Sequence, residues 1–336
     1  MTSSPDVIVI GAGVLGLCTA AELAGRGHAV TVIDPGGPNA SSVAAGMLAP
    51  ALEALLEDMT PEQAGLLKRA RDLWPAFAEA HGLSLHREGA EWRGPDAAAA
   101  VTRLRELGFE AKAMRQGLLT PDDWRIEPGA AMTLLSRTAG LSVVRGRVAR
   151  LAGDARRWRV EADDGRTWFA PTIVLATGAA TAIPGLPPTI AALVETIEPI
   201  RGQLTHLAVE GPGRVVRAPG VYAAPATGGV VIGATMEPGR RDLEPDPDEA
   251  RARVAAGLAL LGVEGEPGPT RVGIRGAVAD GLPLAGPSGQ PGLLLALAPR
   301  RNGWLLGPMV AQVVADGIEG RAPMADAAAL DPLRLS

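Results

Sequence analysis

Cysteine, tyrosine and phenylalanine are scarce in this chain. Its 336 residues include one cysteine and one tyrosine, and aromatic residues make up 3%. The single cysteine, Cys18, excludes an internal disulfide and a cysteine-rich metal site. The four histidines, at positions 28, 81, 86 and 206, do not have the spacing of zinc ligands. We therefore expect no metal site in this protein.

A surplus of positive charge is also absent. The chain has 32 Lys and Arg residues against 37 Asp and Glu residues, a formal net charge of −5. Because phosphate backbones attract basic protein faces, this balance argues against nucleic acid as the main partner. Hydrophobic residues at 47% and charged residues at 21% are typical of a globular protein. The length accommodates a cofactor domain and a substrate domain.

A long hydrophobic run is missing as well. Residues 7–21 are apolar and close to the N-terminus, so a signal peptide is one interpretation. However, Asp6 is the only charged residue before them, and glycines recur inside them. The stretch is also short for a membrane span. A buried strand followed by a buried helix fits better, and we expect a soluble cytoplasmic protein without a membrane partner.

The first part of the chain predicts one βαβ unit. Its apolar runs indicate a strand over 7–10, a helix over 14–24 and a second strand over 29–33. The run 7–10 is continuous, as in a strand that is buried on both faces. Asp34 lies at the carboxyl end of the second strand. Such a unit is typical of a nucleotide-binding domain.

The turn inside this unit has the pattern G-x-G-x-x-G, with glycines at positions 11, 13 and 16. The first glycine allows the tight turn, the second lets the backbone approach a pyrophosphate, and the third lets the helix pack on the strand. The amino end of the helix then faces the phosphate charge. Asp34 is placed to accept hydrogen bonds from ribose hydroxyls. This unit binds a dinucleotide, but alone it does not separate NAD from FAD.

The rest of the chain alternates between helical and β patterns. Helices are predicted over 61–81, 97–107, 128–139, 246–261 and 304–317. An antiparallel meander is expected from segments 141–152, 157–162 and 167–170, with further strands at 173–176, 271–278 and 293–297. Short segments separated by Gly and Pro over 195–234 indicate an antiparallel sheet. We predict an α/β fold, α+β overall: a Rossmann cofactor domain (1–75, 125–190 and 272–336) with an inserted antiparallel-sheet substrate domain (76–124 and 191–271).

A second motif favours FAD over NAD. Residues 172–179, which read TIVLATGA, resemble the strand-to-turn motif of flavoproteins with a glutathione-reductase-type FAD domain. The predicted meander just before this segment is where that fold has one. Taken alone, the segment is more simply a core strand that ends in a glycine turn.

Further segments resemble the D-amino-acid-oxidase superfamily and, within it, the glycine oxidases of thiazole biosynthesis. In chain order they are SSVAAGMLAP at 41–50, RGQ at 201–203, IGAT at 232–235, DGLP at 280–283 and RNGWLL at 301–306. The resemblance covers most of the chain. It is weakest at about 85–125, where this chain looks shortened.

The resemblance implies oxidation of the Cα–N bond of a small amino acid. In the family, hydride moves from Cα to flavin N5 to give an imine, and oxygen then reoxidises the flavin and releases hydrogen peroxide. Positioning of the substrate does most of this work. The substrate carboxylate needs a bidentate cation, for which Arg is suited. The implied catalytic residues are Arg275, Tyr222 and Arg301.

Two of these residues have a plainer interpretation when taken alone. Strand alternation places Arg275 with Arg271 on the face opposite Val272 and Ile274, which by itself indicates a surface residue. The resemblance makes Arg275 the arginine that binds the carboxylate. Tyr222, the only tyrosine, matches the family tyrosine that helps to hold the carboxylate, although an aromatic residue in a sheet is common.

The resemblance also implies which residues hold the flavin. They are Gly11, Ala12, Gly13, Val14, Leu15, Gly16, Asp34, Pro35, Ser41, Ser42, Ala45, Gly46, Met47, Leu48, Val148, Thr177, Gly178, Ala179, Arg275, Arg300, Arg301, Asn302, Gly303, Trp304 and Leu305. The amino end of the C-terminal helix would face the pyrimidine part of the flavin. Some related amine oxidases attach the flavin to a cysteine, but Cys18 lies in the wrong part of the fold for this. We expect non-covalent FAD.

The chain departs from the family pattern at two places. Many relatives have Gly-His where this chain has Ala298-Pro299, and many have Arg where it has Ala226. We expect both changes to alter the wall of the substrate pocket. They affect the identity of the substrate more than the binding of the cofactor.

Three functions follow from these observations. The first is an oxidase of glycine or another small amino acid that supplies thiazole synthesis, with molecular oxygen as electron acceptor. The second is a D-amino-acid or secondary-amine oxidase or dehydrogenase. The third is a non-catalytic FAD-binding subunit, which the presence of both Arg275 and Tyr222 argues against. By analogy with glycine oxidases, we expect a homo-oligomer.

Overall fold

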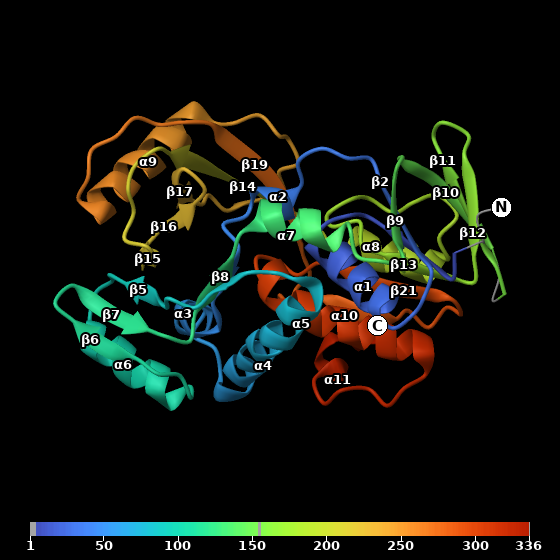
Figure 1. Cartoon of the computed structure of the whole chain (residues 1–336), viewed down its shortest axis with the longest axis horizontal. Coiled ribbons are helices and arrows are strands. Elements are labelled where there is room, and N and C mark those ends of the chain that lie inside the picture. Colours follow the sequence, from blue (N-terminus) through green and yellow to red (C-terminus); the bar gives the residue numbers. More distant parts are fainter. Residues whose placement is uncertain (1–4, 154–155, 336) are drawn as a thin grey trace.

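The computed structural model describes residues 5–153 and 156–335. Figure 1 shows two sheet-based parts side by side. One part contains a parallel sheet with helices α1 (Val14–Gly25) and α10 (Gly303–Glu319). The other contains a larger, mainly antiparallel sheet with helix α9 (Pro247–Leu261). The chain passes between the parts several times, so neither is continuous in sequence.

The parallel sheet has the strand order β20-β21-β13-β1-β2-β9, and its edge strand β20 runs antiparallel. The strands are β1 (Val7–Ile10), β2 (Val30–Asp34), β9 (Leu141–Arg145), β13 (Thr172–Leu175), β20 (Leu284–Pro287) and β21 (Leu293–Leu297). Val7 and Val9 pack into one core, whereas Ile8 and Ile10 pack into the other. Successive side chains point to opposite faces, so the apolar run predicted at 7–10 is a strand buried on both faces.

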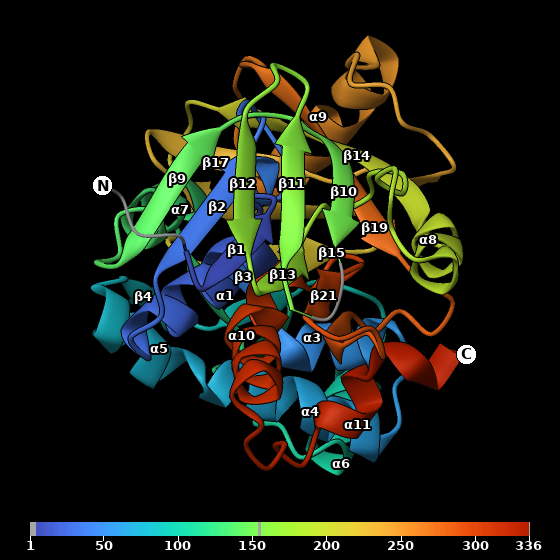
Figure 2. The same ribbon diagram turned by 90° about the vertical axis from the view of Figure 1, so that its right-hand side faces the viewer.

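Helices cover one face of this sheet and a small sheet covers the other. The first core contains α1, α10, α4 (Pro61–Asp72), α5 (Trp74–His81) and α7 (Pro128–Leu135). The second contains the meander β10 (Val148–Gly153), β11 (Trp158–Ala162) and β12 (Thr167–Ala170), and helix α8 (Pro188–Glu195). Figure 2 shows the meander in front of the parallel sheet. This layering confirms the predicted Rossmann-type fold.

The first segment predicted for the meander, 141–152, is wrong as a single strand. It divides at Gly146 into β9, which pairs in parallel with β2, and β10, which belongs to the meander. The Gly146 N–H donates to the carbonyl of Asp34 (2.9 Å). β9 thus pairs with the outer edge of β2, which would otherwise lack ladder partners. At Gly146, beside the end of β2, the chain leaves the parallel sheet and enters the meander.

The predicted helix over 61–81 is also wrong, because it consists of α4 and α5, which divide at Leu73. Pro75 lies in the first turn of α5, where its missing N–H has no consequence. Its ring prevents α4 from continuing through this position. The other helices are confirmed, with α6 at Ala97–Glu106 and α7 ending at Leu135 rather than at 139.

The second sheet has the order β18-β14-β17-β16-β15-β5-β7-β6, and β19 also pairs with β14. Its strands are β5 (Ala90–Trp92), β6 (Lys112–Met114), β7 (Gly117–Thr120), β14 (Glu198–Leu207), β15 (Val215–Ala218), β16 (Val221–Ala226), β17 (Gly229–Gly233), β18 (Glu237–Pro238) and β19 (Thr270–Ala277). The antiparallel sheet predicted for 195–234 is confirmed in β14 to β17. β5 joins it in parallel with β15, a pairing between distant segments that no local pattern indicates.

The domain boundary that we predicted between residues 271 and 272 falls inside β19. Arg271 pairs with Leu204 and Gly276 pairs with Pro199, so the ladder with β14 is continuous across this point. Ladder hydrogen bonds hold both halves of the strand in one sheet. The inserted sheet therefore extends to Ala277.

Short elements connect the two parts: α2 (Ala40–Val43), α3 (Pro50–Leu56), β3 (Met47–Leu48), β4 (Leu85–His86) and β8 (Trp124–Ile126). The Asp123 carboxylate accepts hydrogen bonds from the N–H groups of Ala51 (2.7 Å) and Leu52 (3.1 Å) at the start of α3. These N–H groups have no partner within a helix. Asp123 is 1% exposed, so it anchors α3 from the interior.

Near the C-terminus, helix α11 (Ala327–Leu330) and a 3-10 helix at Pro332–Leu335 pack beside β20. None of the described helices combines the length and the apolar character needed to cross a membrane.

The Asp123 carboxyl predicts how stability depends on pH. Burial raises its pKa from the ordinary value of 3.8 to about 7. Between these values the folded protein holds a proton that the unfolded chain has lost, so the free energy of unfolding falls as the pH rises. Asp123→Asn should remove this contribution, which amounts to at most about 4 kcal/mol. Urea unfolding of both proteins across this pH range measures it, and parallel pH profiles would contradict the assignment.

Candidate active site

The carboxyl ends of β1, β2 and β13 open onto a cavity of about 660 Å³. Its walls include Gly11, Gly13 and Asp34 from the first βαβ unit, Val148 from the meander and Thr177 from the end of β13. Ligands of open α/β sheets bind outside this edge. The structure thus brings together the glycine turn, the acidic residue and the second motif that the sequence indicated.

The glycine turn is packed backbone against backbone. Gly11 has a φ of +111°, and a Cβ added there would lie 2.3 Å from the carbonyl oxygen of Ala176. A Cβ on Gly16 would lie 2.0 Å from the carbonyl oxygen of Gly11. Both positions therefore require glycine, because β1, β13 and α1 meet at this point.

Helix α1 begins beside the cavity without a side-chain cap. Gly13 occupies its N-cap position, and the N–H of Val14 donates to Ser41 Oγ (2.9 Å). Free N–H groups and the helix dipole favour an anion at such an end. The geometry fits the pyrophosphate of a dinucleotide.

Asp34 is oriented at the edge of this cavity by backbone groups. Its two carboxylate oxygens accept hydrogen bonds from the N–H groups of Ala12 and Gly36, each at 2.7 Å. A carboxylate oxygen can accept more than one hydrogen bond. Asp34 therefore keeps acceptor capacity toward the cavity, and its contact with a ribose stays a prediction.

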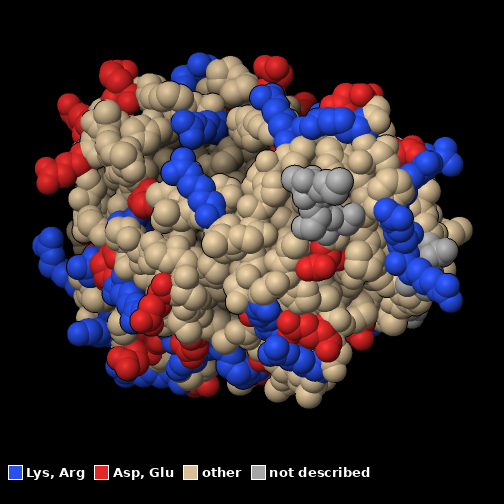
Figure 3. Space-filling view, turned by 45° about the vertical axis from the view of Figure 1, so that its right-hand side comes forward, with Lys and Arg blue, Asp and Glu red and all other residues tan. Residues whose placement is uncertain are grey.

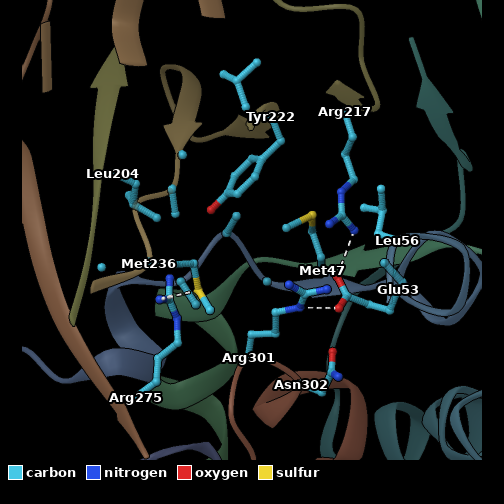
Figure 4. Close-up of a pocket in the computed structure, with 18 of the residues that line it drawn as sticks. Met47, Glu53, Leu56, Leu204, Arg217, Tyr222, Met236, Arg275, Arg301 and Asn302 are labelled. Carbon is cyan, nitrogen blue, oxygen red and sulfur yellow. Dashed lines mark hydrogen bonds and ion pairs between the residues drawn. The ribbon is translucent and has the colours of Figure 1, made fainter. Parts of the chain in front are cut away.

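A second cavity, of about 280 Å³, contains charged side chains from both parts of the molecule (Figure 4). Arg217 of β15, Tyr222 of β16 and Arg275 of β19 reach it from the larger sheet. Glu53 of α3 and Arg301 of the loop before α10 reach it from the other side. The space-filling view in Figure 3 shows a hollow in the surface with basic side chains at its border.

Arg275 faces this cavity with little compensation for its charge. Its Nη1 lies 3.4 Å from both the Thr235 carbonyl oxygen and Met236 Sδ. No carboxylate among residues 5–153 and 156–335 forms an ion pair with it. Burial lowers the pKa of Arg275, yet an arginine in a protein keeps its proton. A guanidinium that is even partly buried is costly without an anion, so Arg275, which is partly buried, is suited to receive an anion from a ligand.

Tyr222 points its hydroxyl into the same cavity (Figure 4). Burial raises the pKa of Tyr222 above its usual value, so the hydroxyl keeps its proton and remains a donor. Glycines make room for both groups, since a Cβ on Gly233 would lie 2.4 Å from the Tyr222 hydroxyl oxygen and one on Gly202 would lie 2.4 Å from Arg275 Nη1. The structure therefore places both predicted residues in one cavity.

Arg301 differs from Arg275 because carboxylates already neutralise it. It forms ion pairs with Glu53, through Nε, and with Glu57, through Nη2 (2.8 Å). Glu53 also pairs with Arg217 Nη1 (2.9 Å). Burial opposes the ionisation of Glu53, but the guanidinium groups of Arg217 and Arg301 outweigh it and lower the pKa of this carboxyl. Glu53 is thus an anion shared by two cations.

A third, smaller cavity of about 100 Å³ lies at the start of α10. It is lined by Arg275, Arg300, Arg301 and Trp304, and also by Gly13 of the glycine turn. It therefore borders residues of both larger cavities. Helix α10, like α1, begins without a side-chain cap. Its free N–H groups favour negative charge.

Most of the predicted flavin residues line one of these three cavities. They are Gly11, Gly13, Val14, Leu15, Asp34, Pro35, Ser41, Ala45, Gly46, Met47, Val148, Thr177, Gly178, Ala179, Arg275, Arg300, Arg301, Asn302, Gly303 and Trp304. Of these, Ala45, Gly46, Met47 and Asn302 line the 280 Å³ cavity and neither of the other two.

The other predicted flavin residues line none of the three cavities. Ala12 directs its N–H to Asp34, and Gly16 packs on Gly11. Ser42 Oγ accepts the N–H of Asn39 and so closes the start of α2. Leu48 and Leu305 are fully buried in the core beside α1. These positions shape the site without facing it.

The two departures from the family pattern contribute little to the cavity walls. Ala226 lies at the end of β16 opposite Gly229, away from the three cavities, and Ala298 is fully buried. Pro299 lines the smallest cavity. Cys18 is buried between α1 and α10, where its Sγ would lie 2.9 Å from a Cβ on Gly307. Cys18 lines none of the three cavities.

Sequence reasoning missed Glu53, Arg217 and Arg241. Glu53 lies in α3, a helix of seven residues for which we predicted nothing. Arg217 lies in a four-residue strand, and Arg241 lines the 660 Å³ cavity from a loop. No motif marks these residues, because their roles depend on side chains brought close by the fold. No cluster of potential metal ligands occurs among the described residues.

Comparison with known families agrees with this geometry. The family model described as FAD dependent oxidoreductase (DAO) matches residues 6–317. The chain belongs to this family and is an FAD-dependent oxidoreductase, which confirms the superfamily that its motifs resemble. The uncapped helix ends, the glycine turn and the cavity at the strand ends fit FAD.

Within this family, the chain is similar to several individual proteins. The chain is 28% identical over 380 residues to the glycine oxidase of Geobacillus kaustophilus, covering 98% of this chain and 96% of the relative. A crystal structure of that enzyme has a TM-score of 0.82 at 26% identity, over 98% of each chain. The chain is also 33% identical over 273 residues to the bifunctional tRNA 5-methylaminomethyl-2-thiouridine biosynthesis protein MnmC of Chromohalobacter salexigens. That match covers 70% of this chain but only 37% of the longer relative.

The glycine turn supports a test of cofactor binding. Gly11→Ala should destabilise the protein by about 1–3 kcal/mol and reduce the FAD retained on purification, because its Cβ would collide with Ala176. Gly25→Ala, at the other end of α1 with open space around it, should stay within about 0.5 kcal/mol of the parent. Thermal unfolding and flavin absorbance per protein measure both effects. Equal behaviour of the two variants would contradict this account of the turn.

Proposed function

We propose that this protein oxidises glycine or another small amino acid, giving an imine and hydrogen peroxide, with molecular oxygen as the electron acceptor. The observation that carries the proposal is the pair of Arg275 and Tyr222 in one cavity, where Arg275 has no carboxylate partner among the described residues. A flavoprotein that only holds its cofactor has no need of such a pair. FAD, when bound, supplies the acceptor for the hydride that leaves Cα.

Arg275 would bind the substrate carboxylate. Its guanidinium can donate two parallel N–H bonds to the two oxygens, which fixes the plane of the carboxylate as well as its position. Tyr222 would donate its hydroxyl hydrogen to one of these oxygens. The two contacts orient Cα in the cavity, and orientation is the main requirement of hydride transfer.

The other residues that line the cavity would exclude water from it and fix the positions of its charged groups. Met47, Leu56 and Trp304 line the cavity with apolar surface, which strengthens the electrostatic contacts inside it. Glu53 has a lowered pKa and is shared by two guanidiniums, so it is a weak base and acts as a structural anion. The chain thus positions the substrate without a strong acid or base.

FAD would be held non-covalently along the strand ends. Gly13 and the start of α1 would face the pyrophosphate, Asp34 the ribose, and Trp304 with the start of α10 the flavin. The single cysteine is buried away from these walls. The two-part arrangement of a flavin domain and an inserted substrate domain is part of this proposal.

The glycine oxidase relatives support glycine as the substrate. A role in thiazole synthesis stays a prediction. The similarity to the bifunctional tRNA-modification protein MnmC supports a secondary amine as the alternative substrate. A cytoplasmic location and a homo-oligomeric state stay predictions.

Anaerobic mixing with glycine, sarcosine, D-alanine and D-proline should bleach the flavin absorbance with at least one of them. Arg275→Met should raise the KM for that substrate by about tenfold to a hundredfold, since a hydrogen bond to a charged group contributes about 1.5–3 kcal/mol. The flavin content should stay at the level of the parent.

Arg271→Met provides the matched control, because Arg271 lies on the same strand but is exposed to solvent. It should leave KM within twofold, roughly the spread of neutral surface changes. If none of the amines bleaches the flavin, the non-catalytic alternative gains. If Arg275→Met instead loses FAD, the residue holds the cofactor and the assignment is wrong.

A further inference from the structure

The 280 Å³ cavity contains more positive charge than a single carboxylate can balance. Its charged walls, among the residues that the structure describes, are three guanidiniums from Arg217, Arg275 and Arg301 against the one carboxylate of Glu53. Including the adjacent pair of Arg300 and Glu57 leaves the same excess of two positive charges. Buried charge without a counterion is costly. A substrate with one carboxylate would balance only half of this excess.

Asp123 reduces the excess only in part. It lies behind α3, where its oxygens accept the N–H groups of Ala51 and Leu52, and it does not line the cavity. Burial raises its pKa to about 7, so a fraction of the protein carries this carboxyl uncharged near neutral pH. Between one and two positive charges therefore remain for a ligand.

Arg217 is the cation best placed to use this excess on a substrate. Arg275 and Arg301 line both the 280 Å³ cavity and the 100 Å³ cavity at the start of α10, whereas Arg217 lines only the larger of these two. Figure 4 shows Arg217 and Arg275 on opposite sides of Tyr222. The charge of Arg217 therefore acts on the side of the cavity away from the start of α10.

Arg217 also has donors to spare. Within residues 5–153 and 156–335, its guanidinium donates one hydrogen bond, from Nη1 to Glu53 Oε1 (2.9 Å), while a guanidinium carries five N–H donors. Glu53 divides its charge between Arg217 and Arg301. A second carboxylate at Arg217 would thus meet both unpaired donors and uncompensated charge.

We propose that the preferred substrate is an amine that carries two carboxylates, one held by Arg275 with Tyr222 and the other by Arg217. This inference rests on the proposed amine oxidation and specifies its substrate class. The second carboxylate can belong to the substituent on nitrogen or to the side chain on Cα. Both cases share the dianionic amine that the two arginines recognise.

Two matched pairs of compounds test the preference. Iminodiacetate and sarcosine differ by a second carboxylate on the nitrogen substituent, and D-aspartate and D-asparagine differ by one on the side chain. In at least one pair, the dianion should reduce the flavin with a kcat/KM at least tenfold higher, as expected for charge-assisted hydrogen bonds. Neither pair showing a preference would overturn the inference.

Binding without oxidation separates this inference from the proposed function. Diglycolate and methoxyacetate have an ether oxygen in place of the amine, and each can be titrated against the flavin absorbance of the holoenzyme. Diglycolate should bind at least tenfold more tightly. Turnover of sarcosine without any preference for dianions would leave the proposed oxidation intact and overturn the substrate class. Tight diglycolate binding without oxidation of any amine would do the reverse.

Variants of the paired residues identify the group responsible. The preference is the ratio of kcat/KM for the dianion to kcat/KM for its matched monoanion. Arg217→Gln should lower this ratio toward one, and Arg217→Lys should restore part of it. A purely structural role would weaken both members of a pair equally and leave their ratio unchanged. Glu53→Gln, which removes the competing carboxylate, should raise the preference. Arg217→Lys keeps a cation beside Glu53, so a result remains available if Arg217→Gln or Glu53→Gln fails to fold. Arg159→Gln, at an exposed position of the meander strand β11, controls for the loss of one positive charge and should leave the ratio unchanged.

Discussion

The carboxylate of Glu53 holds together three segments that are far apart in the chain. It belongs to α3 and forms ion pairs with two guanidiniums, that of Arg217 from β15 and that of Arg301 from the loop before α10. Asp123 in turn anchors the start of α3 from the interior. Removing one partner of a buried ion pair costs about 3–5 kcal/mol because the other charge remains buried. The relative position of the two parts around the cavity depends on this shared anion.

The contrast between Arg275 and Arg301 explains how this site can select its ligand. The two guanidiniums line the same cavity, but carboxylates neutralise Arg301, while Arg275 meets only a carbonyl oxygen and a sulfur atom. A protein can keep a cation without an anionic partner at a site where a bound ligand supplies the anion. The glycines at positions 202 and 233 are part of this arrangement, since a side chain at either would occupy the space of Arg275 or Tyr222.

Local patterns predicted the fold where one segment decides its own structure. The glycines at 11 and 16 marked the turn because backbone contacts permit no side chain there, and the apolar run of β1 marked a strand buried on both faces. The predictions were wrong where a single residue or a distant pairing partner decided where an element ends or which sheet it joins. Pro75 divides the helix predicted over 61–81, and the pairing of β9 with β2 takes 141–145 out of the meander.

The sequence by itself determined the class of cofactor domain and indicated the two residues that we propose to bind the carboxylate, because turn glycines, buried strands and family motifs are written in consecutive residues. Only the tertiary structure decided which charges in the cavity are compensated. Glu53, Arg217 and Arg301 lie in three unrelated segments, and no spacing along the chain indicates that they meet. The balance of charge in a cavity is a sum over neighbours in space, which the order of residues does not show.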